Sequence, residues 1–211
     1  LANMSHELRT PLNSILILGQ QLAENGGGNL TGRQVDFAKN IHSAGTDLLT
    51  LINDILDLSK IEAGAMTIEE QAIDLATLKE HLARNFGQLA QSKGITFRID
   101  LANNLPRAVR TDPKRLQQVL RNLLSNAFKF TEKGAVSVRI EMTENAASQG
   151  PVRGAGPLIA FSVVDSGIGI PAEKQAIIFE AFQQVDGGTD RKYGGTGLGL
   201  TISREIARLL G

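Results

Sequence analysis

The sequence predicts two kinds of architecture in one chain: an α-helical hairpin over residues 1–64 and an α/β domain over residues 65–211. Two observations lead to this prediction. The first part carries apolar side chains at helical spacing, interrupted by one glycine-rich break at 25–29. After the small residues at 63–65, short stretches of alternating apolar and polar residues appear between further helical patterns.

Residues 1–24 form the first predicted helix, because their apolar side chains recur every three or four positions. Thr31 is a suitable N-cap for a second helix that runs to about Glu62. Two helices alone bury little apolar surface, so we expect a second copy to complete a four-helix bundle. Packing of the apolar seam on the rest of the chain is the alternative. The seam of the first helix consists of Leu1, Met4, Leu8, Leu12, Ile15, Leu18 and Leu22.

The second part mixes helical and strand patterns. A helix is expected over 75–91, and another begins at Asp112 and Pro113, where aspartate can cap and proline suits the first turn. This order of elements indicates a sheet with helices on one face. The remaining predicted elements are strands over 95–101, 136–142 and 158–164 and a surface loop over 143–157.

Composition narrows the range of partners. Lys+Arg and Asp+Glu both total 22, so the net charge is 0 and nothing favours nucleic acid or an anionic membrane surface. The chain has no cysteine, which excludes disulfides and thiolate chemistry. No apolar run reaches the roughly 18 residues that span a membrane. We therefore expect a cytoplasmic location with no direct membrane contact, although a larger parent protein can still be membrane-anchored.

One face of the helix that begins near Asp112 is polar. Asn122, Asn126 and Lys129 recur there at helical spacing, apart from the apolar face that starts at Leu116. Asparagine oxygens suit Mg²⁺, which takes its other ligands from water and substrate phosphates, and a lysine neutralises phosphate charge. We therefore predict Asn126, supported by Asn122, as metal ligands and Lys129 as a phosphate contact. A solvated helix face that happens to hold asparagine is the alternative.

Asp165 directly follows the last predicted strand and precedes Gly167 and Gly169. A carboxylate at a strand end can accept a hydrogen bond from an adenine amino group, while glycines let the backbone approach the base. The stretch 167–172 also fits the G-x-G-x-x-A dinucleotide fingerprint. That fingerprint requires a tight turn into a helix within a βαβ unit, whereas Pro171 and a glycine-rich segment follow here. We therefore predict an adenine site rather than a dinucleotide site.

A further glycine-rich segment leads into a predicted helix over 200–210. Unpaired amides at a helix N-terminus bind phosphate, and small residues allow the close approach that this requires. The segment is not a Walker A loop, because no Lys-Ser/Thr pair follows its glycines. A flexible linker is the alternative. The residues predicted to contact phosphate are Gly195, Thr196, Gly197, Leu198 and Gly199.

The segment 171–194 separates these two predicted nucleotide contacts. It is rich in glycine and charged residues, which is typical of a mobile loop. We expect it to act as a lid, with Phe179 and Phe182 as its apolar anchors.

His6 lies beside Glu7 in the first predicted helix, and Thr10 and Pro11 follow. A neutral imidazole is a competent nucleophile, and near neutral pH much of it is neutral. Glu7 can accept a hydrogen bond from one ring nitrogen and so leave the other free to attack. Pro11 removes a backbone donor and should bend the helix just past His6. In isolation His6 would be an ordinary surface histidine, but together with a nucleotide site it suggests a phosphate acceptor.

Together these segments resemble the sensor histidine kinases of two-component systems, and the resemblance covers essentially the whole chain. Five motifs stand in the family's order, which is specific, although any one alone would be weak. The matches are His6 to Pro11 with the H box, Asn122 to Thr131 with the N box, Asp165 to Gly169 with the G1 box, 178–182 with the F box and Gly195 to Leu200 with the G2 box.

The resemblance implies a dimerisation and histidine-phosphotransfer hairpin over residues 1–64. It implies an ATP-binding domain of the gyrase/Hsp90/histidine-kinase/MutL (GHKL) type over 65–211, with ATP and Mg²⁺ as cofactors. The family's last strands normally follow the final helix, so we expect this domain to be C-terminally truncated. Phe130 stands beside the nucleotide in the family pattern, where a tyrosine is common.

The implied activity is ATP-dependent autophosphorylation of His6, followed by transfer to an aspartate of a response-regulator receiver domain. Glu7 and Thr10 are implied to orient water in a reverse phosphatase reaction. The stretch 182–193 looks most similar to the hybrid subgroup, whose kinases carry their own receiver domain, so the receiver can lie in cis or in trans. The implied assembly is a homodimer.

Two other functions are open. The chain can be a GHKL-type ATPase that couples hydrolysis to conformational work, as in the chaperone and topoisomerase relatives, whose turnover would not need His6. It can also be a degenerate dimeric scaffold without activity. The intact Asn126, Asp165 and glycines argue against the scaffold.

Overall fold

The computed structural model divides the chain into two compact units, and each is described by itself. The first contains residues 1–66 and 194–198, and the second contains residues 67–193 and 199–211. Side chains are described from residue 7 onward. The residues that the structure describes are 2–143, 158–183 and 196–211.

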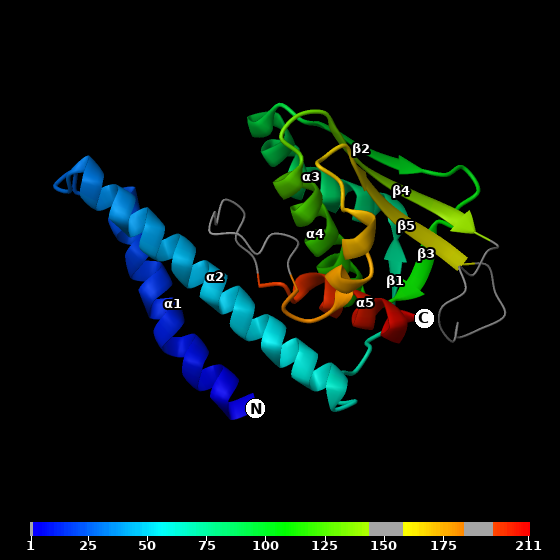
Figure 1. Ribbon diagram of the computed structural model, residues 1–211, viewed down its shortest axis with the longest axis horizontal. Helices are drawn as coiled ribbons and strands as arrows, with labels where there is room; N and C mark the ends of the chain where they lie inside the picture. The colour runs from blue at the N-terminus through cyan, green and yellow to red at the C-terminus, as the bar shows by residue number, and fades with distance from the viewer. Residues whose placement is uncertain (1, 144–157, 184–195) are drawn as a thin grey trace. The chain divides into compact units, whose positions relative to one another are not determined.

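Two long helices, α1 (Ala2–Glu24) and α2 (Gly32–Glu62), form the predicted hairpin of the first unit (Figure 1). Thr31 caps α2 through a capping box: the Gln34 backbone N–H donates to the Thr31 hydroxyl, and the Gln34 side chain accepts from the Thr31 N–H at 2.8 Å. The N-cap predicted at Thr31 is therefore confirmed, and the glycine-rich break becomes a defined turn between the helices.

Only a few apolar residues of the hairpin pack between its own helices. Leu12 of α1 and Ala38 of α2 are buried. Gly45 allows close contact with Leu16, because a Cβ at this position would lie 2.9 Å from the Leu16 Cδ2. The hairpin therefore leaves much of its apolar surface uncovered within its own unit. Its exposed large apolar side chains are Leu8, Ile15, Ile17, Leu18, Leu22, Phe37, Ile41, Leu48 and Ile55.

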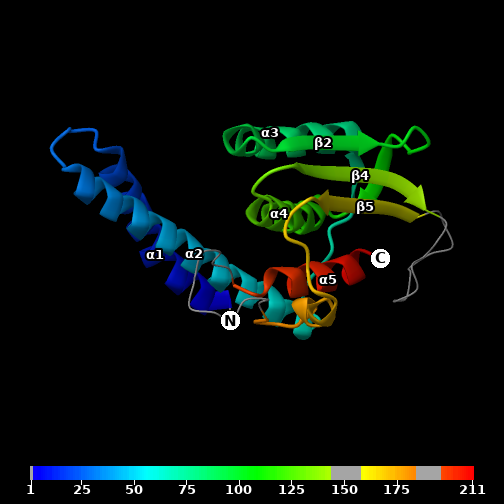
Figure 2. The same cartoon turned by 45° about the horizontal axis from the view of Figure 1, so that its top comes forward.

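A three-stranded sheet covered by helices is the centre of the second unit. Its order is β2 (Thr96–Leu101), β4 (Ala135–Thr143) and β5 (Leu158–Asp165). β2 runs parallel to β4, and β4 runs antiparallel to β5. Helices α3 (Leu75–Lys93) and α4 (Pro113–Phe130) lie on one face of this sheet, as Figures 1 and 2 show and as the sequence predicts.

A small second sheet was not predicted. It pairs β1 (Gln71–Asp74) antiparallel with β3 (Ala108–Thr111). Each strand has four residues, which is too short for a clear alternating pattern, so their pairing depends on the fold around them. Asp74 ends β1 and caps α3, since its carboxylate accepts from the Thr77 N–H at 2.9 Å.

The remaining helices of the unit follow β5. Two 3₁₀ turns, η1 (Ala172–Lys174) and η2 (Ile177–Phe179), precede α5 (Gly199–Leu210). α5 packs against α4. In the part of the chain that the structure describes, no helix combines the length and the apolar character that a membrane crossing requires.

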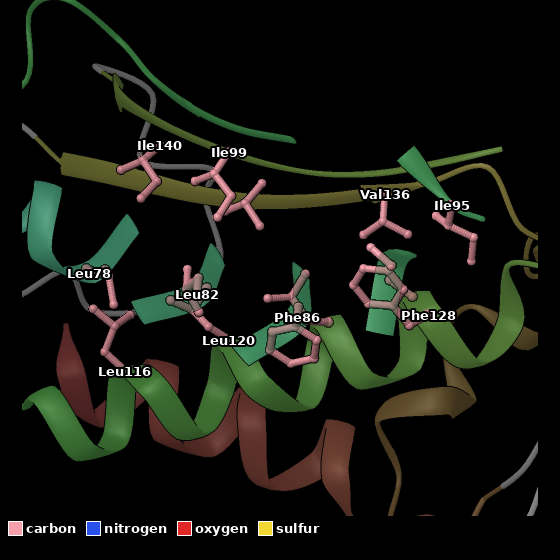
Figure 3. Packing of buried hydrophobic residues seen from close by; sticks show 14 of the residues in the cluster. Leu78, Leu82, Phe86, Ile95, Ile99, Leu116, Leu120, Phe128, Val136 and Ile140 are labelled. Carbon is pink, nitrogen blue, oxygen red and sulfur yellow. The ribbon is translucent and has the colours of Figure 1, made fainter. Parts of the chain in front are cut away.

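The core lies between the sheet and the two helices α3 and α4 (Figure 3). Phe86 of α3 stacks on Phe128 of α4 with ring centroids 5.6 Å apart, and Phe97 of β2 meets both rings edge-on. This packing fixes which face of α4 points inward. The other labelled core residues are Leu78, Leu82, Ile95, Ile99, Leu116, Leu120, Val136 and Ile140.

Leu120→Ala should lower the free energy of unfolding of the second unit by about 3 kcal/mol, because the Leu120 side chain is fully buried and its loss leaves a cavity. Chemical denaturation followed by circular dichroism measures the loss. Leu89→Ala is the control, since Leu89 is an exposed leucine of α3 and should lose less than about 1 kcal/mol. Equal losses in the two variants would contradict the core assignment.

Candidate functional site

Helix α4 begins at a buried aspartate. The Asp112 carboxylate accepts from the backbone N–H groups of Lys114 and Arg115 at 2.9 and 3.1 Å and from that of Glu69 at 3.0 Å. Burial alone would raise the pKa of this carboxyl, but the three N–H donors and the nearby Arg115 guanidinium outweigh burial and hold the pKa below its usual value. The cap predicted at Asp112 is therefore confirmed, and it also ties the segment before β1 to α4.

The predicted polar stripe lies on the face of α4 that points away from the core. Asn122, Asn126 and Lys129 are all half-buried, whereas Leu120 and Leu124 on the core face are fully buried. The side-chain N–H of Asn122 donates to the Ser203 hydroxyl at 2.8 Å. The stripe is thus partly covered rather than open to solvent.

Lys129 lies near the end of α4 beside Phe130. Its ammonium nitrogen is 4.9 Å from the centroid of the Phe130 ring, within cation–π range. Partial removal from water lowers the pKa of Lys129 below its usual value. An anion bound at this position would offset that desolvation.

The end of β5 meets the end of α4. The Gly167 N–H donates to Asp165 Oδ1 at 2.8 Å. A Cβ on Gly167 would lie 2.5 Å from the Phe130 carbonyl oxygen and 2.8 Å from Asp165 Oδ1, so the close approach requires glycine here. Gly169 has a φ of 70°, in the left-handed region that favours glycine. The structure therefore brings together Asp165, Gly167 and Phe130, which the sequence predicts as parts of one site.

The final glycine-rich segment leads into α5. Gly195 lies outside the described residues. The Leu198 N–H donates to the Thr196 hydroxyl at 3.2 Å, and Gly197 has a φ of 69°. Gly199 begins α5 and lies against Asn122: a Cβ here would be 2.5 Å from the Asn122 Oδ1. The N-terminus of α5 and the polar stripe of α4 therefore meet at these two residues.

His6 lies in the first turns of α1, and its side chain is outside the described set. Glu7 and Thr10, on the same helix, are exposed. Between them, Arg9 donates a hydrogen bond to the Asn53 side chain of α2 at 3.0 Å. This bond ties the segment around His6 to the second helix of the hairpin.

Two family models match the chain. The phospho-acceptor domain of the His Kinase A type matches residues 1–64, and the histidine kinase-, DNA gyrase B- and HSP90-like ATPase matches residues 111–211. The chain belongs to the histidine kinases. Its hairpin and its α/β unit correspond to these two domain families, and the GHKL-type fold predicted from the sequence is confirmed.

Several curated histidine kinases are similar to this chain over its whole length. The circadian input-output histidine kinase CikA of Synechococcus elongatus is 43% identical over 100% of this chain and 27% of its own length. The signal transduction histidine-protein kinase BarA of Escherichia coli K12 is 37% identical over 100% of this chain and 22% of its own length. The chain therefore spans less than a third of the curated relatives that it matches, and its relatives include hybrid histidine kinases.

Solved structures show the same fold. Full-length ShkA in complex with AMPPNP superposes with a TM-score of 0.73 at 32% identity, over 98% of this chain and 40% of that chain. The Acinetobacter baumannii histidine kinase AdeS has a TM-score of 0.59 at 23% identity, over 95% of this chain and 85% of that chain. Residues 111–211 match an ATPase family, and the ShkA structure is a complex with the ATP analogue AMPPNP.

The lid predicted over 171–194 is described in this histidine kinase only as far as residue 183, and its residues 184–194 lie outside the described residues. Of its two predicted anchors, Phe179 is half-buried, and its carbonyl accepts a hydrogen bond from the Thr201 hydroxyl of α5 at 2.9 Å. Phe182 is 64% exposed and has a φ of 64°. The described part of the chain thus leaves most of the Phe182 side chain uncovered, which does not support its predicted role as an apolar anchor there.

Two polar residues of α5 in this unit were not predicted from the sequence. Thr201 and Ser203 are 5% and 6% exposed, and their hydroxyls bond Phe179 and Asn122. Their position beside Ile202 could have indicated them, because Ile202 lies on the buried side of an amphipathic helix, where apolar residues are usual.

Gly167→Ala should weaken the binding of Mg-AMPPNP by at least about tenfold, since the added methyl must displace the Phe130 carbonyl or the Asp165 carboxylate. Isothermal titration calorimetry measures the affinity. Gly87→Ala is the matched control: it lies inside α3 with open space around it and should leave the affinity unchanged while stabilising the helix. Unchanged affinity in Gly167→Ala would show that this glycine is not at the nucleotide site.

Proposed function

We propose that this chain is the catalytic core of a hybrid sensor histidine kinase, which phosphorylates His6 from ATP and passes the phosphoryl group to an aspartate of a receiver domain. The observation that supports this most is the pairing of a phospho-acceptor hairpin with an ATPase domain in one chain. We assign residues 1–64 to dimerisation and histidine phosphotransfer and residues 65–211 to ATP binding. The relatives named as hybrid kinases support a receiver domain in the same parent protein.

The adenine is proposed to bind at Asp165. One oxygen of this carboxylate accepts from the Gly167 N–H, so the other can accept from the adenine amino group. Gly167 and Gly169 leave room for the base beside the backbone, and Phe130 lies directly behind Gly167. The exposed Ile168 side chain can cover one face of the base.

The phosphates are proposed to lie between α4 and the N-terminus of α5. Lys129 supplies a cation, and the segment Gly195, Thr196, Gly197, Leu198 and Gly199 supplies backbone N–H groups and the helix dipole. The donor set suits Mg²⁺, because amide oxygens from Asn126 and Asn122 complement phosphate oxygens and water. When bound, Mg²⁺ would neutralise phosphate charge in the transition state.

The chemistry is proposed to take place at His6. One nitrogen of its neutral imidazole bonds to the γ-phosphorus as the bond from that phosphorus to the ADP oxygen breaks. Glu7 holds the proton on the other ring nitrogen and stabilises the positive charge that develops on the ring. In the reverse direction, Thr10 and Glu7 orient the water that hydrolyses a receiver aspartyl-phosphate. Positioning dominates such a reaction because its transition state is loose.

A homodimer is proposed to cover the exposed apolar face of the hairpin. Leu18 is 58% exposed, and similar side chains follow α1 and α2 along their length. A contiguous apolar face of this kind is unfavourable in water unless a partner covers it. A second copy presents the same face and completes a four-helix bundle.

The wild-type chain should incorporate label from γ-labelled Mg-ATP that is lost in acid and kept in alkali, as expected for phosphohistidine. His6→Gln should abolish the label, because His6 is the residue to which the proposal assigns the phosphoryl group. His81→Gln is the control, since His81 is exposed on α3 and is assigned no role. Label retained in His6→Gln would exclude His6 as acceptor, and ATP hydrolysis without label in the wild type would favour a conformational ATPase.

Leu18→Glu should convert the dimer to a monomer, because it places a charge in the centre of the proposed bundle interface. Sedimentation velocity measures the mass, and the affinity for Mg-AMPPNP should stay unchanged because the ATP-binding unit is not altered. Asn13→Glu on the same helix is an exposed control. A monomeric wild type at micromolar concentration would contradict the proposed assembly.

A further inference from the structure

The first turns of α5 carry two buried hydroxyl groups that the activity proposed above does not use. Thr201 and Ser203 are 5% and 6% exposed, and their neighbours Ile202 and Ile206 are buried apolar residues. A buried hydroxyl is unfavourable unless it is hydrogen-bonded, and an alanine would avoid that cost at either position. Their bonds therefore indicate what these hydroxyls do.

Ser203 bonds to a residue of the proposed nucleotide site. Its hydroxyl oxygen accepts from the Asn122 Nδ2 at 2.8 Å. Because an amide group is planar, fixing its nitrogen also fixes the direction of its oxygen. The whole Asn122 amide then lies against the first residue of α5, since a Cβ on Gly199 would be 2.5 Å from its Oδ1 and 2.8 Å from its Nδ2. Without the serine, the amide can rotate and exchange its donor and acceptor ends.

Thr201 bonds to the segment before the glycine-rich loop. Its hydroxyl donates to the Phe179 carbonyl at the end of η2, at 2.9 Å. Two side chains of one helix turn therefore link α5 to α4 and to η2, all within the second unit. Figures 1 and 2 show that α5 runs beside α4 in both views.

We infer that Ser203 is a positioning residue of the nucleotide site, which holds the Asn122 amide with its oxygen beside the N-terminus of α5. This inference rests on the proposed function, because it assigns Asn122 to the metal and phosphates of ATP. Thr201 acts in parallel by holding η2 against the same helix turn. The first turns of α5 thus bond both to the polar stripe of α4 and to η2.

A double-mutant cycle tests this inference. The probe is Mg-AMPPNP, and its affinity for the full chain is measured by isothermal titration calorimetry. Ser203→Ala should weaken binding by about fivefold, the usual effect of one lost hydrogen bond. In an Asn122→Ala background the same substitution should change affinity by less than about twofold, because the group that Ser203 orients is then absent.

Two further variants separate orientation from folding. Ser203→Thr keeps the hydroxyl and should restore affinity to within about twofold of the unsubstituted chain. Ser92→Ala is a serine control at an exposed position of α3, outside the N box, and it should leave the affinity unchanged. The melting temperature of each variant shows whether the fold is intact.

The outcomes distinguish this inference from the function on which it rests. An equal loss from Ser203→Ala with and without Asn122 would overturn it, since the serine would then act on the fold alone. Normal affinity in Ser203→Ala would also overturn it and leave the proposed function standing. No binding of Mg-AMPPNP by the unsubstituted chain would overturn the proposed function itself, and the inference with it.

Discussion

The rotational setting of α4 is the constraint on which the proposed site depends. One face of this helix carries fully buried leucines, and its Phe128 ring packs against the rings of both Phe86 and Phe97. Turning the helix would expose these side chains at a cost of about 1.5–3 kcal/mol each. The opposite face, with Asn122, Asn126 and Lys129, therefore points in one fixed direction. The buried Asp112 cap sets where the helix begins, so it also sets the positions of these residues along the axis.

Two glycines of the ATP-binding unit lie unusually close to α4. Gly167 and Gly199 are not merely flexible residues, because a Cβ at either position would collide with a residue of α4. Gly167 meets the carbonyl of Phe130, and Gly199 meets the side chain of Asn122. The two ends of the predicted site are thus held against α4 by contacts that no larger residue permits. Such contacts preorganise a nucleotide site without side chains that would occupy the space of the ligand.

The helical hairpin is well ordered locally but buries few of its apolar side chains. Its helices are well defined by the capping box at Thr31 and by the turn that Asn25 closes through two hydrogen bonds to Leu30. Its apolar residues nonetheless remain largely exposed, since Leu12 and Ala38 alone among the described apolar residues of the two helices are buried. A structure with strong local order and little internal burial is suited to assembly with a partner. The same unit carries His6, so the proposed assembly and the proposed phosphate acceptance involve one element.

The sequence by itself determined the long elements, their caps and the motifs. Helical spacing is visible over residues 1–62, and Asp112 with Pro113 marks the start of α4, because these signals are local along the chain. The order of the motifs was enough for the family, which the comparisons show. Only the tertiary structure decided the rest. β1 and β3 are too short to recognise in the sequence, and each is stabilised by pairing with the other. The contact between the Ser203 hydroxyl and Asn122 depends on how α5 packs against α4, which no local pattern shows. The exposure of Phe182 was likewise hidden, since whether an aromatic ring is covered depends on neighbours distant in sequence.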